Sequence, residues 1–522
     1  MKKKYLSFQE KFERKISFFS KNLIVSLLII GFSGFLIRII FLDFTVPMNS
    51  DNFVYFRYAG DIIVSSRNYD GIANNGWPVF LSLFFSLIPS EQFLDYMLFQ
   101  KLLTISLSVL TIIPIYLLAR KFLNRTFSLF STLVFIFEPR VIQNSLFGIT
   151  EPLYIITLTI SMTLLFSEKY FLRYISFVIL SLAILIRSEG LFLLPIFFII
   201  FFFITKKNFK SIIHYFIISA LVILVLLPAS ILRTEEFGHD GLTNRINMGI
   251  EHMEKTSSDI ENGTFSMILS GIFNMLKFFT WSQIPYLIFF VPLGIFLFFK
   301  SRTFFQKAII ILGVCILIPT IYPYAYANDT RYILPLYPIF SIISGFSVKF
   351  LLQRKINKKI PLMIIICLII SSSILFLEWK NIDENHEIEL YNLSKEVASR
   401  TSTINEYFPE SSYLNLIGLY EMNKFPAPSV EYLKNNVKIY WYEDANNLEE
   451  LIKISRKNES SYLVIDENPN RKSFIKEILI EENNFPYLVK IFDSIEEGYQ
   501  YKLNIYKIDY EKFDNFYNLK ND

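Results

Sequence analysis

The sequence predicts a polytopic α-helical membrane protein that ends in a soluble α/β domain. Of its 522 residues, 52% are hydrophobic, and apolar runs of membrane-spanning length recur between residues 23 and 378. After Phe376 the composition turns abruptly polar and charged. A helix rises about 1.5 Å per residue, so about 20 apolar residues cross a hydrocarbon layer about 30 Å thick. We therefore expect a transmembrane domain over 1–379 and a soluble domain over 380–522.

The first apolar run covers 23–41 and is interrupted only by Ser, Gly and the late Arg38. A lysine-rich start precedes it, as in a signal peptide. The run is too long for a signal-peptide core, however, and no small-residue cleavage site follows. We expect an uncleaved first transmembrane helix.

Further apolar runs bring the predicted total to about eleven transmembrane helices. The 126–138 run is short for a full span, so we expect it to be tilted or extended by its neighbours. The remaining runs are 97–119, 148–166, 172–186, 190–205, 211–231, 283–299, 308–323, 332–348 and 360–378.

The distribution of Lys and Arg predicts the topology. If the lysine-rich start is cytoplasmic, every loop on that side is basic, as the positive-inside rule requires. The opposite face then carries two long external loops, 43–96 and 232–282, and several short turns. An odd number of spans places the C-terminal domain outside the cytosol. We expect a multi-pass protein of the cell (plasma) membrane with a cytoplasmic N-terminus.

The C-terminal domain shows strand-like runs at 461–466 and 503–508 among helical patterns. Of the four His residues only His386 lies in it, and we find no catalytic or metal-ligand pattern there. Cys315 and Cys367 both fall in predicted spans. Neither a disulfide framework nor a cysteine-based zinc site is therefore expected.

Asp51 is the first candidate catalytic residue. Together with Tyr55 and Tyr58 it has the spacing i, i+4, i+7, which places all three on one face of a short helix along the membrane. A carboxylate there can act as general base, with the two tyrosines as substrate contacts. Alternatively, Asp51 caps this helix, since 49–52 is rich in capping residues. A second interfacial helix, anchored by Trp77, is expected downstream.

Two further acids, Glu151 and Glu189, fall on the same predicted face. Glu151 lies between Thr150 and Pro152, at the start of a helix, where a carboxylate is favourable against the helix dipole without any function. Glu189 stands in an Arg-Ser-Glu-Gly turn between two spans. Each acid alone therefore has a structural explanation.

Arg331 lies where a late span begins, in the sequence Asn-Asp-Thr-Arg-Tyr-Ile-Leu-Pro. Unpaired backbone N–H groups at a helix start favour an anion, and a guanidinium adds a forked partner for phosphate. The alternative is an interfacial arginine that extends to lipid headgroups.

Taken together, these segments resemble the GT-C integral-membrane glycosyltransferases, in particular the branch of protein O-mannosyltransferases and lipid A aminoarabinose transferases. The resemblance covers roughly residues 20–350. It implies a polyprenyl-phosphate sugar donor at the external face, with Asp51 as the base and Arg331 holding the lipid phosphate. Glu151 and Glu189 would then be acids that line the cavity.

The sequence departs from the family pattern at two places. The family's first loop often has two consecutive acids, whereas here Asn52 follows Asp51. We therefore predict no defined metal site, although the family resemblance leaves room for a divalent cation. The Trp-Trp-Asp-Tyr-Gly motif of oligosaccharyltransferases is replaced by Tyr-Trp-Tyr-Glu-Asp at 440–444. This disfavours transfer of a whole glycan to Asn.

The predicted activity is inverting transfer of a hexose or pentose from dolichyl or undecaprenyl phosphate to a protein, lipid or glycan acceptor of the cell envelope. No glycine-rich nucleotide loop is evident, and no nucleic-acid partner is expected. One rival is a transporter or flippase for lipid-linked sugars, which would place charges in mid-span rather than at the external helix ends. The other rival is a scaffold or sensor that acts through its C-terminal domain.

Overall fold

The computed structural model describes residues 22–44, 50–65, 76–88, 90, 92–205, 210–241, 263–300, 303–325, 329–353, 359–380, 384–401, 404–406, 440–441, 445–457, 459–467 and 472–521. The chain forms two compact units. The first comprises Met1–Leu42, Asp70–Trp77 and Lys101–Lys380, and the second comprises Asp43–Tyr69, Pro78–Gln100 and Asn381–Asp522.

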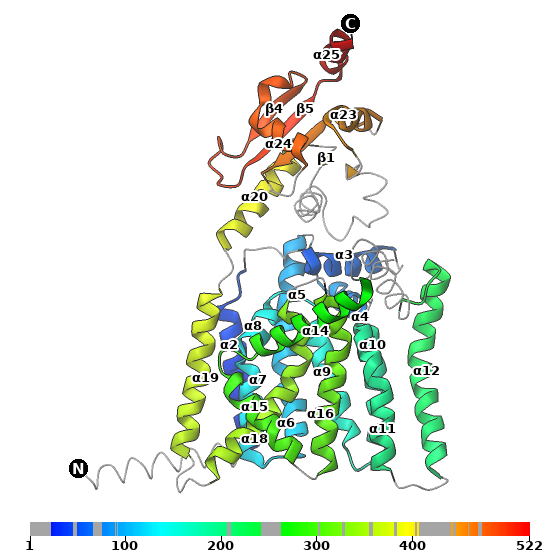
Figure 1. The fold of residues 1–522 in the computed structure, drawn as a ribbon, viewed down its shortest axis with the longest axis vertical. Helices are drawn as coiled ribbons and strands as arrows, with labels where there is room; N and C mark the ends of the chain where they lie inside the picture. The colour runs from blue at the N-terminus through cyan, green and yellow to red at the C-terminus, as the bar shows by residue number, and fades with distance from the viewer. Residues whose placement is uncertain are drawn as a thin grey trace, which may run out of the picture. The chain divides into compact units, whose positions relative to one another are not determined.

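The first unit is helical throughout its described part, and most of its long helices run along a common direction (Figure 1). Three 3-10 turns, η1 (Ser188–Leu193), η2 (Ile318–Thr320) and η3 (Thr330–Leu336), interrupt them. The helices are α2 (Leu23–Ile40), α6 (Ile112–Ala119), α7 (Arg125–Ile136), α8 (Pro139–Leu146), α9 (Glu151–Leu165), α10 (Tyr170–Ile186), α11 (Leu194–Ile204), α12 (Lys210–Phe237), α14 (Gly263–Trp281), α15 (Leu287–Lys300), α16 (Phe304–Leu317), α17 (Ile321–Tyr324), α18 (Tyr337–Leu352) and α19 (Lys359–Trp379).

The protein is a mostly helical membrane protein, as predicted. Six helical stretches of the described chain are long and apolar enough to cross a membrane: Leu23–Ile40, Leu94–Ala119, Ile212–Glu235, Phe304–Tyr324, Thr330–Leu352 and Ile360–Trp379. The other predicted runs coincide with apolar helices of 10–17 residues. Shorter helices span only when tilted or extended, so the total of about eleven spans remains a prediction. Cys315 and Cys367 lie in two of the long stretches and are free.

The segment 232–282, expected to be an external loop, is partly helical. It contains the end of α12 and the whole of α14. Gly271 lets α14 approach α17 closely, because a Cβ at this position would lie 2.4 Å from the carbonyl oxygen of Ile321. The region around Pro139, expected to be a short loop, forms helix α8. Pro139 has no backbone N–H to lose at this first helical position.

A fully buried arginine ties α2 to its neighbours. The Arg38 Nη1 donates to the carbonyl oxygens of Gly34 and Ile136, at 2.8 and 3.0 Å. Its Nε donates to Ser145 Oγ and its Nη2 to Ser108 Oγ, at 3.0 and 3.1 Å. A buried charge is costly unless it is hydrogen-bonded. Arg38 therefore holds four segments of the bundle together through oxygen acceptors.

The second unit contains α3 (Ser50–Ser65), most of α4 (Gly76–Phe85) and the start of α5 (Phe93–Leu110). Phe56 on α3 and Phe85 on α4 lie with ring centroids 5.8 Å apart. The predicted helices at Asp51 and at Gly76 are confirmed. The interfacial role of Trp77 is wrong, since its side chain is fully buried and its Nε1 donates to the Gly148 carbonyl oxygen at 3.2 Å.

The C-terminal part of this unit is a soluble α/β domain, as predicted. Its strands are β1 (Ile404–Glu406), β2 (Tyr440–Trp441), β3 (Tyr462–Asp466), β4 (Leu488–Asp493) and β5 (Leu503–Ile508), in the sheet order β2-β1-β3-β5-β4. β1 is parallel to β2 and β3, whereas β5 is antiparallel to β3 and β4. β3 and β5 match the predicted strands. The helices are α20 (Glu384–Arg400), α23 (Leu448–Lys457), α24 (Ser473–Ile480) and α25 (Tyr510–Asn521).

Strand β5 is buried on both faces of the sheet. Leu503 and Ile505 pack with Leu393 of α20 in one apolar cluster. Tyr506 and Ile508 belong to a second cluster with residues of α23, α24 and α25. Because successive side chains of a strand point to opposite faces, this sheet lies between helices on both sides.

Candidate active site

Three charged residues of the first unit form one connected cluster. The Arg187 Nη1 lies 2.5 Å from Glu151 Oε1, and its Nη2 lies 2.9 Å from Glu189 Oε1. The Arg187 Nε is 3.5 Å from the second oxygen of Glu189. We call Glu151, Arg187 and Glu189 the carboxylate clamp. The structure thus joins two of the predicted site acids through a single guanidinium.

Local backbone geometry explains how the clamp forms. Helix α10 ends at Ile186, and Arg187 has an extended backbone with φ −143° and ψ 121°. The Gly190 N–H then donates to the Arg187 carbonyl oxygen at 3.1 Å, which closes the turn into η1. Glu189 is therefore held two residues after Arg187, in η1. Glu151 comes from elsewhere in the chain, as the first residue of α9.

The clamp is largely removed from solvent. Glu151 is 2% exposed, and the side chains of Arg187 and Glu189 are 11% and 24% exposed. Glu151 Oε2 is buried and has no hydrogen-bond partner within the described residues. Carboxylates in such surroundings need a nearby positive charge. Arg187 supplies it to both.

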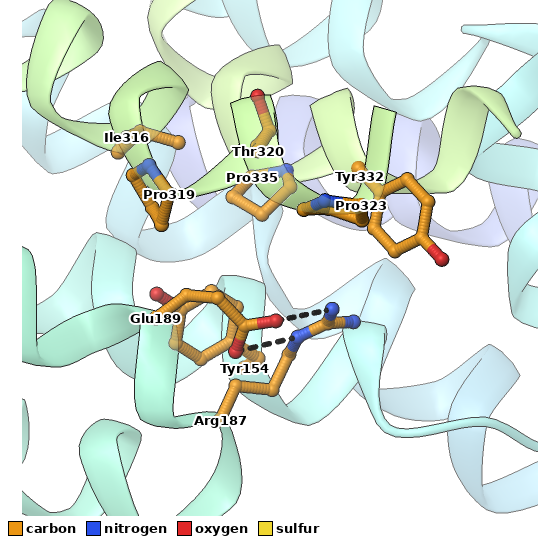
Figure 2. Close-up of a pocket in the computed structure, with 9 residues that line it drawn as sticks. All are labelled: Tyr154, Arg187, Glu189, Ile316, Pro319, Thr320, Pro323, Tyr332 and Pro335. Atoms are coloured by element: carbon orange, nitrogen blue, oxygen red, sulfur yellow. Dashed lines mark hydrogen bonds and ion pairs between the residues drawn. The ribbon is translucent and has the colours of Figure 1, made fainter. Parts of the chain in front are cut away.

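A small pocket opens on this clamp (Figure 2). Arg187, Glu189 and Tyr154 form one wall, and η2, α17 and η3 supply the facing wall, which carries three proline rings. Such a pocket suits a ligand with apolar faces and polar edges. Its lining residues are Tyr154, Arg187, Glu189, Ile316, Pro319, Thr320, Pro323, Tyr332 and Pro335.

Arg331 lies on η3, one residue before the pocket-lining Tyr332. Its guanidinium is a third exposed and pairs with Asp329, with Nε and Oδ2 2.9 Å apart. The Arg331 backbone N–H also donates to Asp329 Oδ1, at 2.9 Å. Asp329 therefore caps the helix start where the sequence suggested an open seat for phosphate. A phosphate-binding role of Arg331 remains a prediction, and it would require phosphate to compete with Asp329.

Asp51, Tyr55 and Tyr58 all lie on α3, as their spacing predicted. Asp51 is the second residue of this helix, and its side chain lies outside the described residues. Tyr55 is half-buried and Tyr58 is buried. The roles of these residues in catalysis and substrate binding remain predictions.

A second buried ion pair lies at the start of α8. Glu138 is 1% exposed, and its Oε1 is 3.6 Å from Arg140 Nη1. Arg140 donates to the carbonyl oxygens of Trp281, Ser282 and Ile284, in the turn between α14 and α15. Three bonds to backbone oxygens indicate a structural role, namely fixing α8 against this turn.

Solved structures of other proteins share this architecture, although no family model and no curated protein matches the sequence. One is ArnT from Cupriavidus metallidurans, solved bound to undecaprenyl phosphate. The match has a TM-score of 0.58 and 10% sequence identity, and it covers 93% of this chain and 98% of ArnT. The chain has the GT-C fold.

The oligosaccharyltransferase AglB from Archaeoglobus fulgidus is also similar. In complex with an inhibitory peptide and a dolichol-phosphate it matches with a TM-score of 0.53 and 12% identity, over 84% of this chain and 69% of AglB. A complex of the Archaeoglobus fulgidus oligosaccharyltransferase with Zn and sulfate matches with a TM-score of 0.52 and 13% identity, over 84% and 68%. At these identities the likeness establishes the GT-C fold and leaves the substrates to be proposed.

The clamp does not fit a divalent cation. Glu151 Oε1 and both oxygens of Glu189 already face Arg187. Across the described part of the chain, no group of three or more His, Cys, Asp or Glu side chains is placed to hold a metal ion. A bound cation would therefore have to displace the guanidinium from its carboxylates.

Sequence reasoning did not select Arg187, Tyr154 or Tyr332 as site residues. Arg187 carries a weak signal, because it stands two residues before Glu189 in the same turn. Its pairing with Glu151, 36 residues earlier, has no signal in a single sequence. Tyr154 and Tyr332 face the pocket only because α9 and η3 lie beside each other in the fold.

Proposed function

We propose that this GT-C protein transfers a sugar from a polyprenyl-phosphate donor to a protein, lipid or glycan acceptor. The observation that carries the proposal is the likeness to ArnT over nearly the whole of both chains, because ArnT was solved with undecaprenyl phosphate. The likeness to AglB in complex with a dolichol-phosphate and a peptide supports the same class of donor. The sugar is a hexose or a pentose.

In the proposed reaction, the Asp51 carboxylate takes the proton from an acceptor hydroxyl or amine. The acceptor attacks the anomeric carbon, the bond from this carbon to the phosphate oxygen breaks, and the polyprenyl phosphate leaves with the electron pair. A single displacement inverts the configuration at the anomeric carbon. The Arg331 guanidinium stabilises the negative charge of the departing phosphate, as fixed cations do in sites shielded from water.

The pocket beside the clamp is the proposed sugar subsite. Tyr332 offers an aromatic ring to the apolar side of a sugar, and Arg187 and Glu189 offer charged groups to its hydroxyls. Tyr154 lines the same wall, with the Arg187 guanidinium over its ring. Glu151 holds Arg187 in place. Tyr55 and Tyr58, on the helix of Asp51, are proposed acceptor or donor contacts.

The proposed location is the cell membrane, with the N-terminus in the cytoplasm and the C-terminal domain on the external face. The basic residues of alternate loops support this orientation. It would place the chemistry on the external side, where a lipid-linked sugar is available without a nucleotide.

Purified protein in nanodiscs tests the proposal. It would be incubated with dolichyl- and undecaprenyl-phosphate sugars and candidate acceptors, and free polyprenyl phosphate and glycosylated product would be measured. We expect both to appear together and to depend on Asp51. Movement of the intact donor across a vesicle membrane, with no release of polyprenyl phosphate, would instead identify a flippase. If the donor is neither cleaved nor moved across the membrane, the result would favour a scaffold or sensor that acts through its C-terminal domain.

A further inference from the structure

The carboxylate clamp contains one positive and two negative groups in a mostly buried position. Glu151 Oε1 and Glu189 Oε1 contact two nitrogens of the same guanidinium, so the two carboxylates converge on one guanidinium group. Glu151 Oε2 is also buried and makes no hydrogen bond within the described residues. Two converging carboxylates with an unused oxygen are typical ligands for a hard divalent cation.

We propose that Arg187 is the resident cation of this site. Its guanidinium fills the position that a divalent cation would take between Glu151 and Glu189, so the native protein binds no divalent cation there. Removal of the guanidinium should convert the same two carboxylates into a metal-binding site. The catalytic meaning of this substitution rests on the proposed function, whereas the binding statement does not.

Electrostatics supports the proposal that Arg187 takes the place of a metal ion. A divalent cation beside the intact guanidinium would meet like-charge repulsion in surroundings that screen charges weakly. It would also have to take Glu151 Oε1 from a contact of 2.5 Å. The guanidinium is part of the chain itself. The positive charge that it brings to the clamp therefore does not depend on metal supply.

The test uses full-length protein in nanodiscs, stripped with EDTA and dialysed. Melting temperature would be measured in EDTA and across a titration with MnCl2, for the native protein and for Arg187→Met, which keeps chain length without charge. We expect the native melting temperature to be unchanged by EDTA and by Mn²⁺. Arg187→Met should melt lower in EDTA, because two carboxylates lose their cation, and should rise saturably with Mn²⁺.

Two control variants make the result specific to the clamp. Arg187→Met combined with Glu151→Gln should lose the rise with Mn²⁺, because one of the two ligands is gone. Arg456→Met removes an arginine from a surface pair with Asp514, where the contact is 2.8 Å, and should show no response to Mn²⁺. Bound Mn²⁺, counted by electron paramagnetic resonance, should follow the same pattern.

Several outcomes would overturn the inference. A native protein that loses stability in EDTA, or that keeps close to one divalent ion per chain after dialysis, and that loses this property in the Glu151→Gln variant, has a metal where Arg187 is proposed to act. A folded Arg187→Met variant with no response to Mn²⁺ shows that the carboxylates cannot hold a metal. If Arg187→Met does not fold, the metal content and EDTA response of the native protein show whether the clamp holds a metal ion or the arginine alone. None of these measurements uses sugar transfer, so their outcome is separate from that of the proposed function.

Discussion

The candidate site contains several charged side chains, and the ion pair that each one forms limits its possible role in catalysis. Glu151 and Glu189 share Arg187, whereas Arg331 pairs with Asp329. Glu151 Oε1 and both oxygens of Glu189 are already taken up by contacts with Arg187. The clamp acids are therefore poor candidates for the catalytic base, and the proposed base remains Asp51.

Asp51→Asn should lower the rate of sugar transfer by about 10²–10⁴-fold, because the amide cannot accept the proton of the acceptor. Expression and folding should be retained, since Asn preserves the size and polarity of the side chain. Initial rates per folded protein provide the measurement. Asp95→Asn, which changes an acid in the first turn of α5, is the matched control and should be near native. Substantial activity in the Asp51 variant would leave this residue with a structural role at the start of α3.

Arg331→Lys should reduce kcat/KM for the polyprenyl-phosphate donor by about tenfold or more, because a point charge lacks the forked contact to phosphate. The kcat/KM for the acceptor should change little. Kinetics with each substrate varied in turn separate the two effects, and Arg456→Lys in the C-terminal domain is the control. An effect confined to the acceptor would make Arg331 an interfacial anchor.

At the scale of elements, close helix contacts depend on glycine. Gly345 of α18 faces α7 and the preceding turn, and a Cβ there would lie 2.2 Å from Ser131 Oγ and 3.0 Å from the Phe127 carbonyl oxygen. The Phe127 backbone cannot move aside without shifting α7. These two helices therefore pack at a separation that only a missing side chain permits.

Gly345→Ala should destabilise the protein by about 1–3 kcal/mol, the range for overpacked sites. Gly313→Ala is a matched control on α16, because its nearest neighbours would be 3.7 Å away, an ordinary contact. Alanine also favours a helix more than glycine does, so this control should be neutral or slightly stabilising. Thermal unfolding in detergent compares the two variants, and equal losses would contradict the proposed packing at Gly345.

The edge strand β4 carries a charge network that should make the C-terminal domain sensitive to pH. Hydrogen bonding to Asp493 raises the pKa of Lys490 above its ordinary value, against the effect of burial. Burial alone would raise the pKa of Asp493, but hydrogen bonds from Lys490 and from the backbone N–H groups of Glu496 and Ile495 outweigh it and keep that pKa low. The two charges therefore stabilise the folded domain together.

The direction in which stability changes with pH follows from the pKa shifts of Asp493 and Lys490. A lowered Asp493 pKa stabilises the fold above the ordinary aspartate pKa of about 3.9, and this contribution is lost as pH falls through the folded value. A raised Lys490 pKa stabilises the fold below about pH 10.4 and is lost as pH rises through the folded value. Lys490→Met should therefore lower the stability of the C-terminal domain between about pH 5 and 9. The variant should also lose less stability than the native domain when the solution is made acidic. Proteolysis of the domain across pH measures this, and Lys453→Met, at an exposed helix pair, is the control.

The predicted topology of the molecule places the C-terminal domain on the same external side of the membrane as the segments of Asp51 and Arg331. Lys457 is exposed at the end of α23. Lys457→Cys, in a background with Cys315→Ser and Cys367→Ser, should react with a membrane-impermeant thiol reagent in intact cells. Labelling that appears only after lysis would place the domain in the cytosol and break the eleven-span topology.

Local patterns in the sequence were enough to predict the membrane class, the position of most helices, the soluble α/β domain and the strands β3 and β5. Hydrophobic length and periodicity are local properties, and a transmembrane helix satisfies its backbone within its own segment. The same local reasoning placed Asp51, Tyr55 and Tyr58 on one helix. Local reasoning gave the wrong result for Trp77. A tryptophan at a helix start predicts a position at the membrane interface, but the fold buries this side chain.

The tertiary structure alone decided the carboxylate clamp, the four-way contacts of Arg38 and the cap that Asp329 places beside Arg331. Glu151 meets Arg187 because α9 and α10 are packed neighbours, and Arg38 reaches Ser145 across 107 residues of sequence. Which charged groups meet depends on how the helices pack. A single sequence reveals the charge of Arg187 but not the two carboxylates that it neutralises, and those carboxylates determine whether the site holds a metal ion or an arginine.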